Sequence, residues 1–261
     1  MWTTRRLARY AAALLTVVGS AFVPAAESAP AVAAASDLKF ALEEIAGHFR
    51  TDSGRDVRLT FGSSGNLARQ IEQGAPFELF LSADEDLVFG LADKGLTRDR
   101  GALYAIGRIV LFVPAGSSIA PDPDLEGLRR ALVAGQVNHF AIANPEHAPY
   151  GRAAEQALRR AGLWPRLQGR LVLGENVSQA AQFAVGGDTE GGIIAYSLAL
   201  APTMASRGRF ALLPETWHAP LRQRMVLMKG ATADGASFYT YLQGPVARAI
   251  MERHGFMLPG Q

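Results

Sequence analysis

The sequence predicts an α/β protein with two lobes, each built from strands flanked by helices. Short apolar runs alternate with amphipathic stretches along the chain after residue 29, which is typical of strands alternating with helices. One apolar run, residues 102–114, is longer than an ordinary strand and contains Gly107, so we expect it to cross between the lobes. Hydrophobic residues are 49% of the 261 residues, so the chain can bury a sizeable core.

The first residues have the pattern of a secretory signal peptide. Three arginines precede an apolar run at residues 11–23, and small residues follow it. We expect residues 1–28 to be a signal peptide, cleaved between about residues 25 and 29. The apolar run is short for a membrane span, which disfavours the alternative of an uncleaved anchor.

Net charge argues against a nucleic-acid partner. The whole chain has 26 Lys and Arg against 24 Asp and Glu, a formal net charge of +2. The first 25 residues hold three of the arginines and no acid, so the remainder has a net charge of −1. The expected mature chain therefore lacks a basic excess. The chain has no cysteine, which excludes disulfides, thiolate metal ligands and a Cys nucleophile.

The first part of the mature chain predicts three strands, each followed by a helix. Apolar residues have period two in the strands and helical spacing in the helices. The expected strands are residues 31–35, 57–61 and 78–83, and the expected helices lie within residues 36–49, 62–74 and 84–95.

The second part of the chain predicts a second unit of the same kind, followed by a return to the first lobe. The expected strands are residues 138–144, 170–175, 209–214 and 222–228, and residues 191–200 are expected to be a strand that runs into a turn or helix. The expected helices lie within 124–135, 149–162, 176–187 and, as two helices, 236–256. We expect lobe I to comprise residues 29–106 plus 216–261 and lobe II residues 107–215. The crossing segments near Gly107 and at residues 212–224 are the candidate hinges.

Four predicted junctions between a strand and a helix carry small or polar residues. A helix N-terminus presents free N–H groups and the positive end of the helix dipole, so several N-termini that converge can bind an anion without Lys or Arg. Hydroxyl groups at these junctions add neutral donors. Taken singly, Ser36, Ser64 and Asn176 are also explained as ordinary N-caps, so the anion-site interpretation depends on the set.

Six segments of the mature chain match a known family in the same order. They are AAASDL (33–38), FGSSGNLARQIEQGAPFELFLSAD (61–84), ANPEHAPYGRAAEQAL (143–158), GENVSQA (174–180), GGIIAYS (191–197) and YLQGPVARAIMERHGF (241–256). In these segments the chain resembles the periplasmic molybdate-binding proteins of the ModA family. The resemblance implies a two-lobed, type II-like periplasmic binding protein, with mixed sheets flanked by helices and the ligand in the cleft between the lobes.

The same resemblance implies a function and a set of site residues. The protein would be a monomer that captures molybdate, and also tungstate, and delivers it to the membrane permease of an ABC importer. No catalytic residue, cofactor or cation site is implied, because molybdenum would be bound only as its oxyanion. By position, the ligand-binding residues are Ser36, Ser64, Tyr150 and the backbone N–H of Val177, with Asp37, Ser63 and Tyr196 as secondary candidates.

One departure from the family pattern concerns a tyrosine that some members have at the position of Ala195. Tyr196 is one residue further on, and adjacent strand residues face opposite sides, so we do not expect it to substitute directly. We hypothesise that Tyr150 supplies the missing hydroxyl from another direction. For Asp37, we expect the carboxylate to turn away from the oxyanion and cap the helix, while its backbone N–H faces the ligand.

Two other functions stay open. A receptor for another tetrahedral oxyanion, such as sulfate or phosphate, would share the fold and the compartment. A secreted hydrolase could pair His147 or His48 with Ser36 or Ser64 and Asp84. It is disfavoured because no G-x-S-x-G elbow is present. We instead expect His147 to be a loop residue bonded to the backbone.

Overall fold

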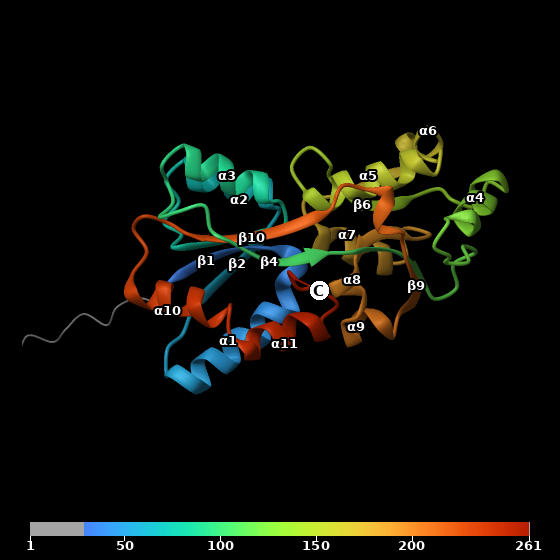
Figure 1. Ribbon diagram of the computed structural model, residues 1–261. Coiled ribbons are helices and arrows are strands. Elements are labelled where there is room, and N and C mark those ends of the chain that lie inside the picture. The colour runs from blue at the N-terminus through green and yellow to red at the C-terminus, as the bar shows by residue number, and fades with distance from the viewer. Residues whose placement is uncertain (1–28, 261) are drawn as a thin grey trace, which may run out of the picture.

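The chain folds into two lobes that lie side by side, each with a five-stranded mixed sheet (Figure 1). The computed structural model describes residues 29–260, so the predicted signal peptide lies outside the described residues. Within that range, no helix has both the length and the apolar character needed to cross a membrane. The predicted fold class is confirmed.

Lobe I is built on a sheet with strand order β2-β1-β3-β10-β4. Strands β1 and β3 are buried, largely apolar runs. Strand β1 pairs in parallel with both β2 and β3, whereas β10 is antiparallel to β3 and β4. The five strands are β1 (Ala31–Ala35), β2 (Arg58–Gly62), β3 (Leu79–Ser82), β4 (Ala102–Gly107) and β10 (Leu221–Leu227).

Helices cover both faces of this first sheet (Figure 1). A 3-10 turn, η1 (Ser36–Leu38), joins β1 directly to α1 and so places Ser36 at the carboxyl end of β1. One face carries α2 (Ser64–Glu72) and α3 (Glu85–Asp93), and the other carries α1 (Lys39–Ser53), α10 (Ala233–Tyr241) and α11 (Pro245–Arg253).

Lobe II repeats this plan with strand order β7-β6-β8-β5-β9. Its strands are β5 (Ile109–Pro114), β6 (Phe140–Ala143), β7 (Leu171–Gly174), β8 (Gly192–Ala195) and β9 (Gly208–Leu212). Its helices are α4 (Glu126–Val133), α5 (Pro149–Arg160), α6 (Trp164–Leu167), α7 (Val177–Val185), α8 (Tyr196–Ala199) and α9 (Pro202–Ala205).

The chain crosses between the lobes twice. The long apolar run crosses between the lobes as expected, because β4 ends at Gly107 in the first sheet and β5 begins at Ile109 in the second. The chain returns after β9 through a 3-10 turn, η3 (Glu215–Trp217), and β10 enters the first sheet as expected. The exact lobe boundaries stay a prediction, and Gly107, which they assign to lobe II, pairs with Leu221 in the first sheet.

Candidate ligand-binding site

A small cavity lies between the lobes at the point where several helices begin. About 10 Å³ of it is open to the centre of a water-sized sphere, so the cavity is narrow and nearly filled by its own lining. Lobe I lines it with Ser36, Asp37, Ser63 and Ser64, and lobe II with Pro149, Tyr150 and Val177.

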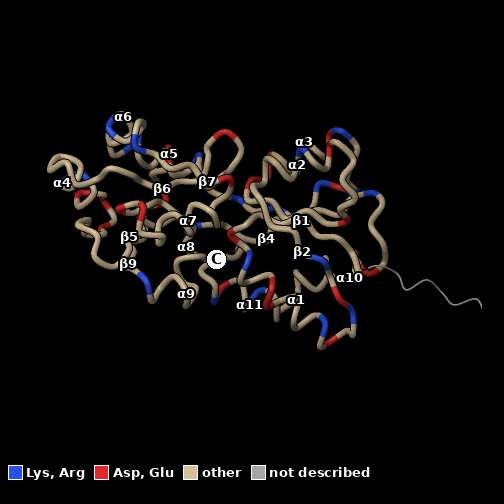
Figure 2. Tube along the Cα trace, turned by 180° about the vertical axis from the view of Figure 1, so that it is seen from behind, with Lys and Arg blue, Asp and Glu red and all other residues tan. Residues whose placement is uncertain are grey.

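The lining of this cavity contains no Lys or Arg. Figure 2 shows that Lys and Arg residues are instead distributed along the backbone of both lobes, together with Asp and Glu. Any attraction for an anion in the cavity must therefore come from hydroxyl groups, backbone N–H groups and helix dipoles.

The hydroxyls of Ser36 and Ser64 each accept one hydrogen bond and can still donate their own hydrogen. Ser64 Oγ accepts the backbone N–H of Ala83 at 3.0 Å, and Ser36 Oγ accepts the backbone N–H of Ser178 at 3.2 Å. Both serines are buried. A hydroxyl that accepts one bond still has its own hydrogen to donate, and burial leaves few other acceptors for it. The two serines therefore offer oriented, uncharged donors.

Helix N-termini supply the other donors of the cavity. Val177 is the first residue of α7, and the Asn176 side chain caps this helix by accepting the Gln179 N–H at 3.1 Å, as predicted. Pro149 begins α5. The N–H groups in the first turn of a helix have no partner within it, and the helix dipole makes them attractive to anions.

The alternative interpretation of the serines as plain N-caps is wrong for Ser36 and Ser64. Residue Ser63, not Ser64, is the N-cap of α2, and its hydroxyl accepts the Asn66 N–H at 3.4 Å. The turn η1 begins after Ala35 and has no side-chain cap. The hydroxyls of Ser36 and Ser64 are therefore not used to begin their helices.

The side chain of Asp37 does not cap the helix, so that expectation is wrong. The 3-10 turn directs the carboxylate inward, where only 1% of the residue is exposed. Its Oδ2 accepts bonds from Tyr150 Oη at 2.9 Å and from Gln223 Nε2 at 2.6 Å. Gln223 Oε1 in turn accepts the Tyr104 hydroxyl at 2.7 Å. Burial raises the pKa of Asp37 to about 6, and the bonds from Gln223 and Tyr150 oppose this shift.

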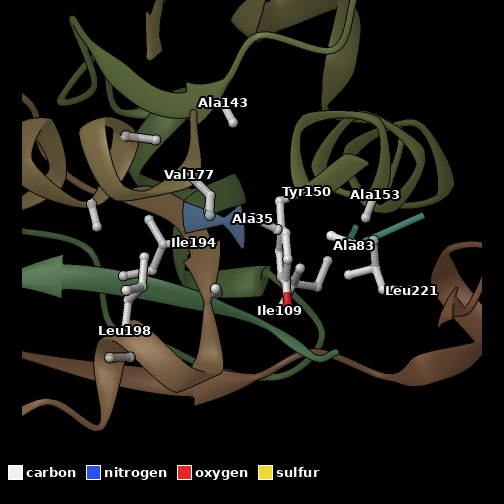
Figure 3. Packing of buried hydrophobic residues seen from close by; sticks show 14 of the residues in the cluster. Ala35, Ala83, Ile109, Ala143, Tyr150, Ala153, Val177, Ile194, Leu198 and Leu221 are labelled. Carbon is white, nitrogen blue, oxygen red and sulfur yellow. The ribbon is translucent and has the colours of Figure 1, made fainter. Parts of the chain in front are cut away.

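The structure places Tyr150 in the cavity wall, but its hydroxyl bonds to Asp37. The ring stands among buried apolar residues that include Ala35 and Ile109 (Figure 3). Because the hydroxyl hydrogen is donated to Asp37 Oδ2, a direct bond from this hydroxyl to a ligand would compete with that contact. The role of Tyr150 in binding stays a prediction.

Tyr196 lies outside this cavity, so the structure does not support it as a secondary candidate. It is the first residue of α8, and its ring packs edge-on against Phe210 with the ring centroids 5.8 Å apart. Ring atoms of Tyr196 also lie beside Gly255 near the C-terminus. This placement agrees with the expectation that Tyr196 does not replace a tyrosine at Ala195.

His147 is bonded to side chains, which corrects the expectation that its ring would bond to the backbone. Its Nδ1 lies 3.0 Å from Ser63 Oγ, and its Nε2 lies 3.4 Å from Glu175 Oε2. None of the predicted hydrolase triads is brought together, because Ser64 bonds to Ala83 and Asp84 caps α3. Within residues 29–260, no group of three or more metal-ligating side chains could hold a metal ion.

Contacts between the lobes close the cavity. The Gly65 N–H donates to the His147 carbonyl at 3.0 Å, and Ser178 Oγ donates to the Ser36 carbonyl at 2.8 Å. Two further pairs, Asn66 with Glu175 and Asp84 with Arg152, also join the lobes. The approach is tight at Gly65, where a Cβ atom would lie 2.5 Å from the His147 carbonyl oxygen.

Gln223 is a site residue that the sequence reasoning missed. Burial alternates along β10, with Leu221, Gln223 and Met225 buried and Arg222 exposed. A glutamine on the buried face of a predicted strand needs polar partners, so the period-two pattern could have flagged it. Its partners are far away in the sequence, and no pattern identified them.

Comparisons with known proteins find relatives in sequence and a similar overall structure. The family described as bacterial extracellular solute-binding protein matches residues 30–257. The molybdate-binding protein ModA of Rhodobacter capsulatus is 33% identical over 250 residues, covering 95% of each chain. ModA of Escherichia coli (strain K12) is 32% identical over 251 residues, again covering 95% of each. The solved periplasmic molybdate-binding protein of Azotobacter vinelandii is 32% identical with a TM-score of 0.79, covering 88% of this chain and 99% of that one.

Proposed function

Because the chain belongs to the bacterial extracellular solute-binding protein family, we propose that it captures molybdate, and also tungstate, and delivers it to the membrane permease of an ABC importer. In this proposal the protein is a periplasmic monomer that has lost its signal peptide. It is a binding protein and not an enzyme, since its relatives are solute-binding proteins.

The observation that carries the proposal is the pair of buried serine hydroxyls that face one cavity from two junctions. Ser36 and Ser64 each accept a backbone N–H, so each has a hydrogen left for a ligand oxygen. The starts of α5 and α7 line the same cavity from the other lobe. Uncharged donors around a small space suit a compact oxyanion.

The chemistry of these donors also favours a fully deprotonated ion. A serine hydroxyl that is already accepting a bond, like a backbone N–H, offers a hydrogen, and a protonated ligand oxygen facing it would set a donor against a donor. Asp37 Oδ1 is different, because it lines the same cavity as an acceptor. Molybdate and tungstate are similar in size and charge. Sulfate is smaller and would reach the same donors through longer, weaker bonds.

Titration calorimetry of the mature protein with molybdate, tungstate, sulfate and phosphate tests this function. We expect tight, one-to-one binding of molybdate and tungstate and much weaker binding of the other two ions. Tight binding of sulfate without binding of molybdate would instead identify a receptor for another oxyanion.

Ser36→Ala should weaken molybdate binding by roughly 10- to 100-fold, because a hydrogen bond to a charged group contributes about 1.5–3 kcal/mol. The bond that Ser36 Oγ accepts comes from the other lobe, so the fold of lobe I does not depend on it. Calorimetry measures the affinity, and Ser53→Ala on the exposed end of α1 is the matched control. Equal affinities of the two variants would remove Ser36 from the site.

Tyr150→Phe should weaken molybdate binding by about tenfold, the effect of one lost hydrogen bond in a buried site. In this proposal the hydroxyl, which bonds to Asp37 in the structure, turns to donate to a ligand oxygen, and the substitution removes that donor. Fluorescence titration measures the affinity. Binding as tight as that of the unmodified protein would contradict the role that we propose for this hydroxyl.

A further inference from the structure

We propose that Asp37 is a proton-binding residue of the ligand site, so that binding of a divalent oxyanion between the lobes takes up one proton at its carboxyl group. This inference depends on the proposed function, since it needs a dianion as ligand. It adds a proton to the binding equilibrium. The free dianion, the Asp37 carboxylate and one proton give a complex in which the carboxyl group is neutral.

The first support is the position of the carboxylate. Asp37 lines the cavity and is 1% exposed, so a dianion bound there is a near neighbour of this side chain. Its Oδ2 accepts two bonds, from Tyr150 and Gln223. Its Oδ1 is buried without a hydrogen-bond partner in the part of the chain that the structure describes. A proton on Oδ1 leaves the bonds from Tyr150 and Gln223 to Oδ2 in place and turns an acceptor into a donor.

The second support is that the groups facing Asp37 are uncharged. Tyr150 faces it from α5, Tyr104 stands behind Gln223 on β4, and Ser197 of α8 donates to the Asp37 carbonyl at 2.8 Å. Burial raises the pKa of both tyrosines well above the ordinary value of 10, so they stay neutral. No positive group among these neighbours balances an ionised Asp37 next to an anion.

The nearby charged and titratable side chains are engaged elsewhere. Lys39, two residues along the chain, is half-buried and pairs with Glu43 at 3.0 Å. His147 contacts Ser63 and Glu175 at the edge of the cavity. The Arg152 side chain, which also joins the lobes, pairs with Asp84 and not with Asp37. His147 is thus the main rival for a proton taken up on binding.

Electrostatics gives the direction of the effect. Burial already raises the pKa of Asp37 to about 6 before an anion is bound. A dianion in the same cavity is a like charge, which raises the pKa of a carboxyl group further. At a pH between these two pKa values, Asp37 is ionised in the free protein and neutral in the complex. Binding then takes up a proton, and the dissociation constant increases as the pH rises.

Calorimetry with molybdate at pH 7.5, in two buffers of different ionisation enthalpy, counts the protons. We expect an uptake approaching one proton per ion for the unmodified protein. Asp37→Asn should still bind molybdate but take up almost none, and the exposed Glu146→Gln is the matched control that keeps the full uptake. The dissociation constant of the unmodified protein should rise by up to about tenfold per pH unit above pH 6, and that of Asp37→Asn should stay constant.

The possible outcomes separate this inference from the proposed function. Molybdate binding without proton uptake by the unmodified protein overturns the inference and leaves the function intact. An unmodified protein that binds neither molybdate nor tungstate overturns the function. Uptake that persists in Asp37→Asn and disappears in His147→Gln assigns the proton to His147 and also overturns the inference.

A further variant covers the case in which Asp37→Asn does not fold. Tyr150→Phe removes a hydrogen bond that favours the ionised carboxylate, so it should raise the pKa of Asp37 in the free protein. The pH above which binding takes up a proton should rise with that pKa. If this onset pH is the same in Tyr150→Phe and the unmodified protein, Asp37 is not the residue that takes up the proton.

Discussion

Replacing Gly65 with alanine should weaken molybdate binding by about 100-fold, equivalent to about 3 kcal/mol, through overpacking between the lobes. The new Cβ would lie 2.5 Å from the carbonyl oxygen of His147 in the other lobe. Closure also needs the 3.0 Å hydrogen bond between the same two residues. Separation of the lobes relieves the clash, so we expect the thermal unfolding of the ligand-free variant to match that of the unmodified protein.

Gly90→Ala is the control for this experiment. Gly90 lies within α3, and a Cβ atom there meets nothing within 4 Å. Alanine is the better helix former by up to about 1 kcal/mol, so this variant should be slightly more stable and bind molybdate normally. Calorimetry and thermal unfolding on both variants provide the measurements. Normal binding by Gly65→Ala would contradict the closed arrangement of the lobes.

Asp37→Asn should stabilise the protein at pH 7.5 by about 3 kcal/mol, the free energy that corresponds to a shift of roughly two pKa units. The pKa of Asp37 is raised from 3.8 in the unfolded chain to about 6 in the folded protein. The unmodified protein therefore loses stability as the pH rises from about 4 to 6, and the loss is complete above that range. Asparagine keeps an oxygen that can accept the bonds from Tyr150 and Gln223.

Urea unfolding of both proteins at pH 4 and pH 7.5 tests this expectation. The difference in unfolding free energy should be small at pH 4, where Asp37 is neutral in the folded state and about half protonated in the unfolded state. Glu146→Gln, an exposed carboxylate in the loop before α5, should show no difference at either pH. An Asp37→Asn variant that is less stable at pH 7.5 would contradict the unfavourable burial of this charge.

Local pattern was enough to predict most of the fold. Strict alternation or short apolar runs located the strands, and Gly107 marked the point where one apolar run divides between two sheets. The four-residue helices α6 and α9 were not predicted, because an element of about one turn shows no measurable apolar period.

Only those site residues whose neighbours in the sequence indicate their role could be predicted. Ser36, Ser64 and Val177 stand at junctions whose own sequence indicates a helix start, and the structure brings all three to one cavity. The environment of Asp37 was not predictable, because its partner Gln223 lies 186 residues further along the chain. A single sequence shows that a residue can accept hydrogen bonds but does not identify a distant donor.

The position of β10 has a consequence for the order in which the chain can fold. Strand β10 lies between β3 and β4, so β4 has no neighbour in its sheet until residues 221–227 are available. The sheet of lobe II uses only strands from residues 109–212, which form one continuous stretch. As the chain is synthesised from its N-terminus, the second sheet can therefore be completed before the first. The sheet of lobe I thus contains the first strands to be synthesised and is the last sheet to be completed. A chain truncated before β10 would leave β4 as an unpaired strand.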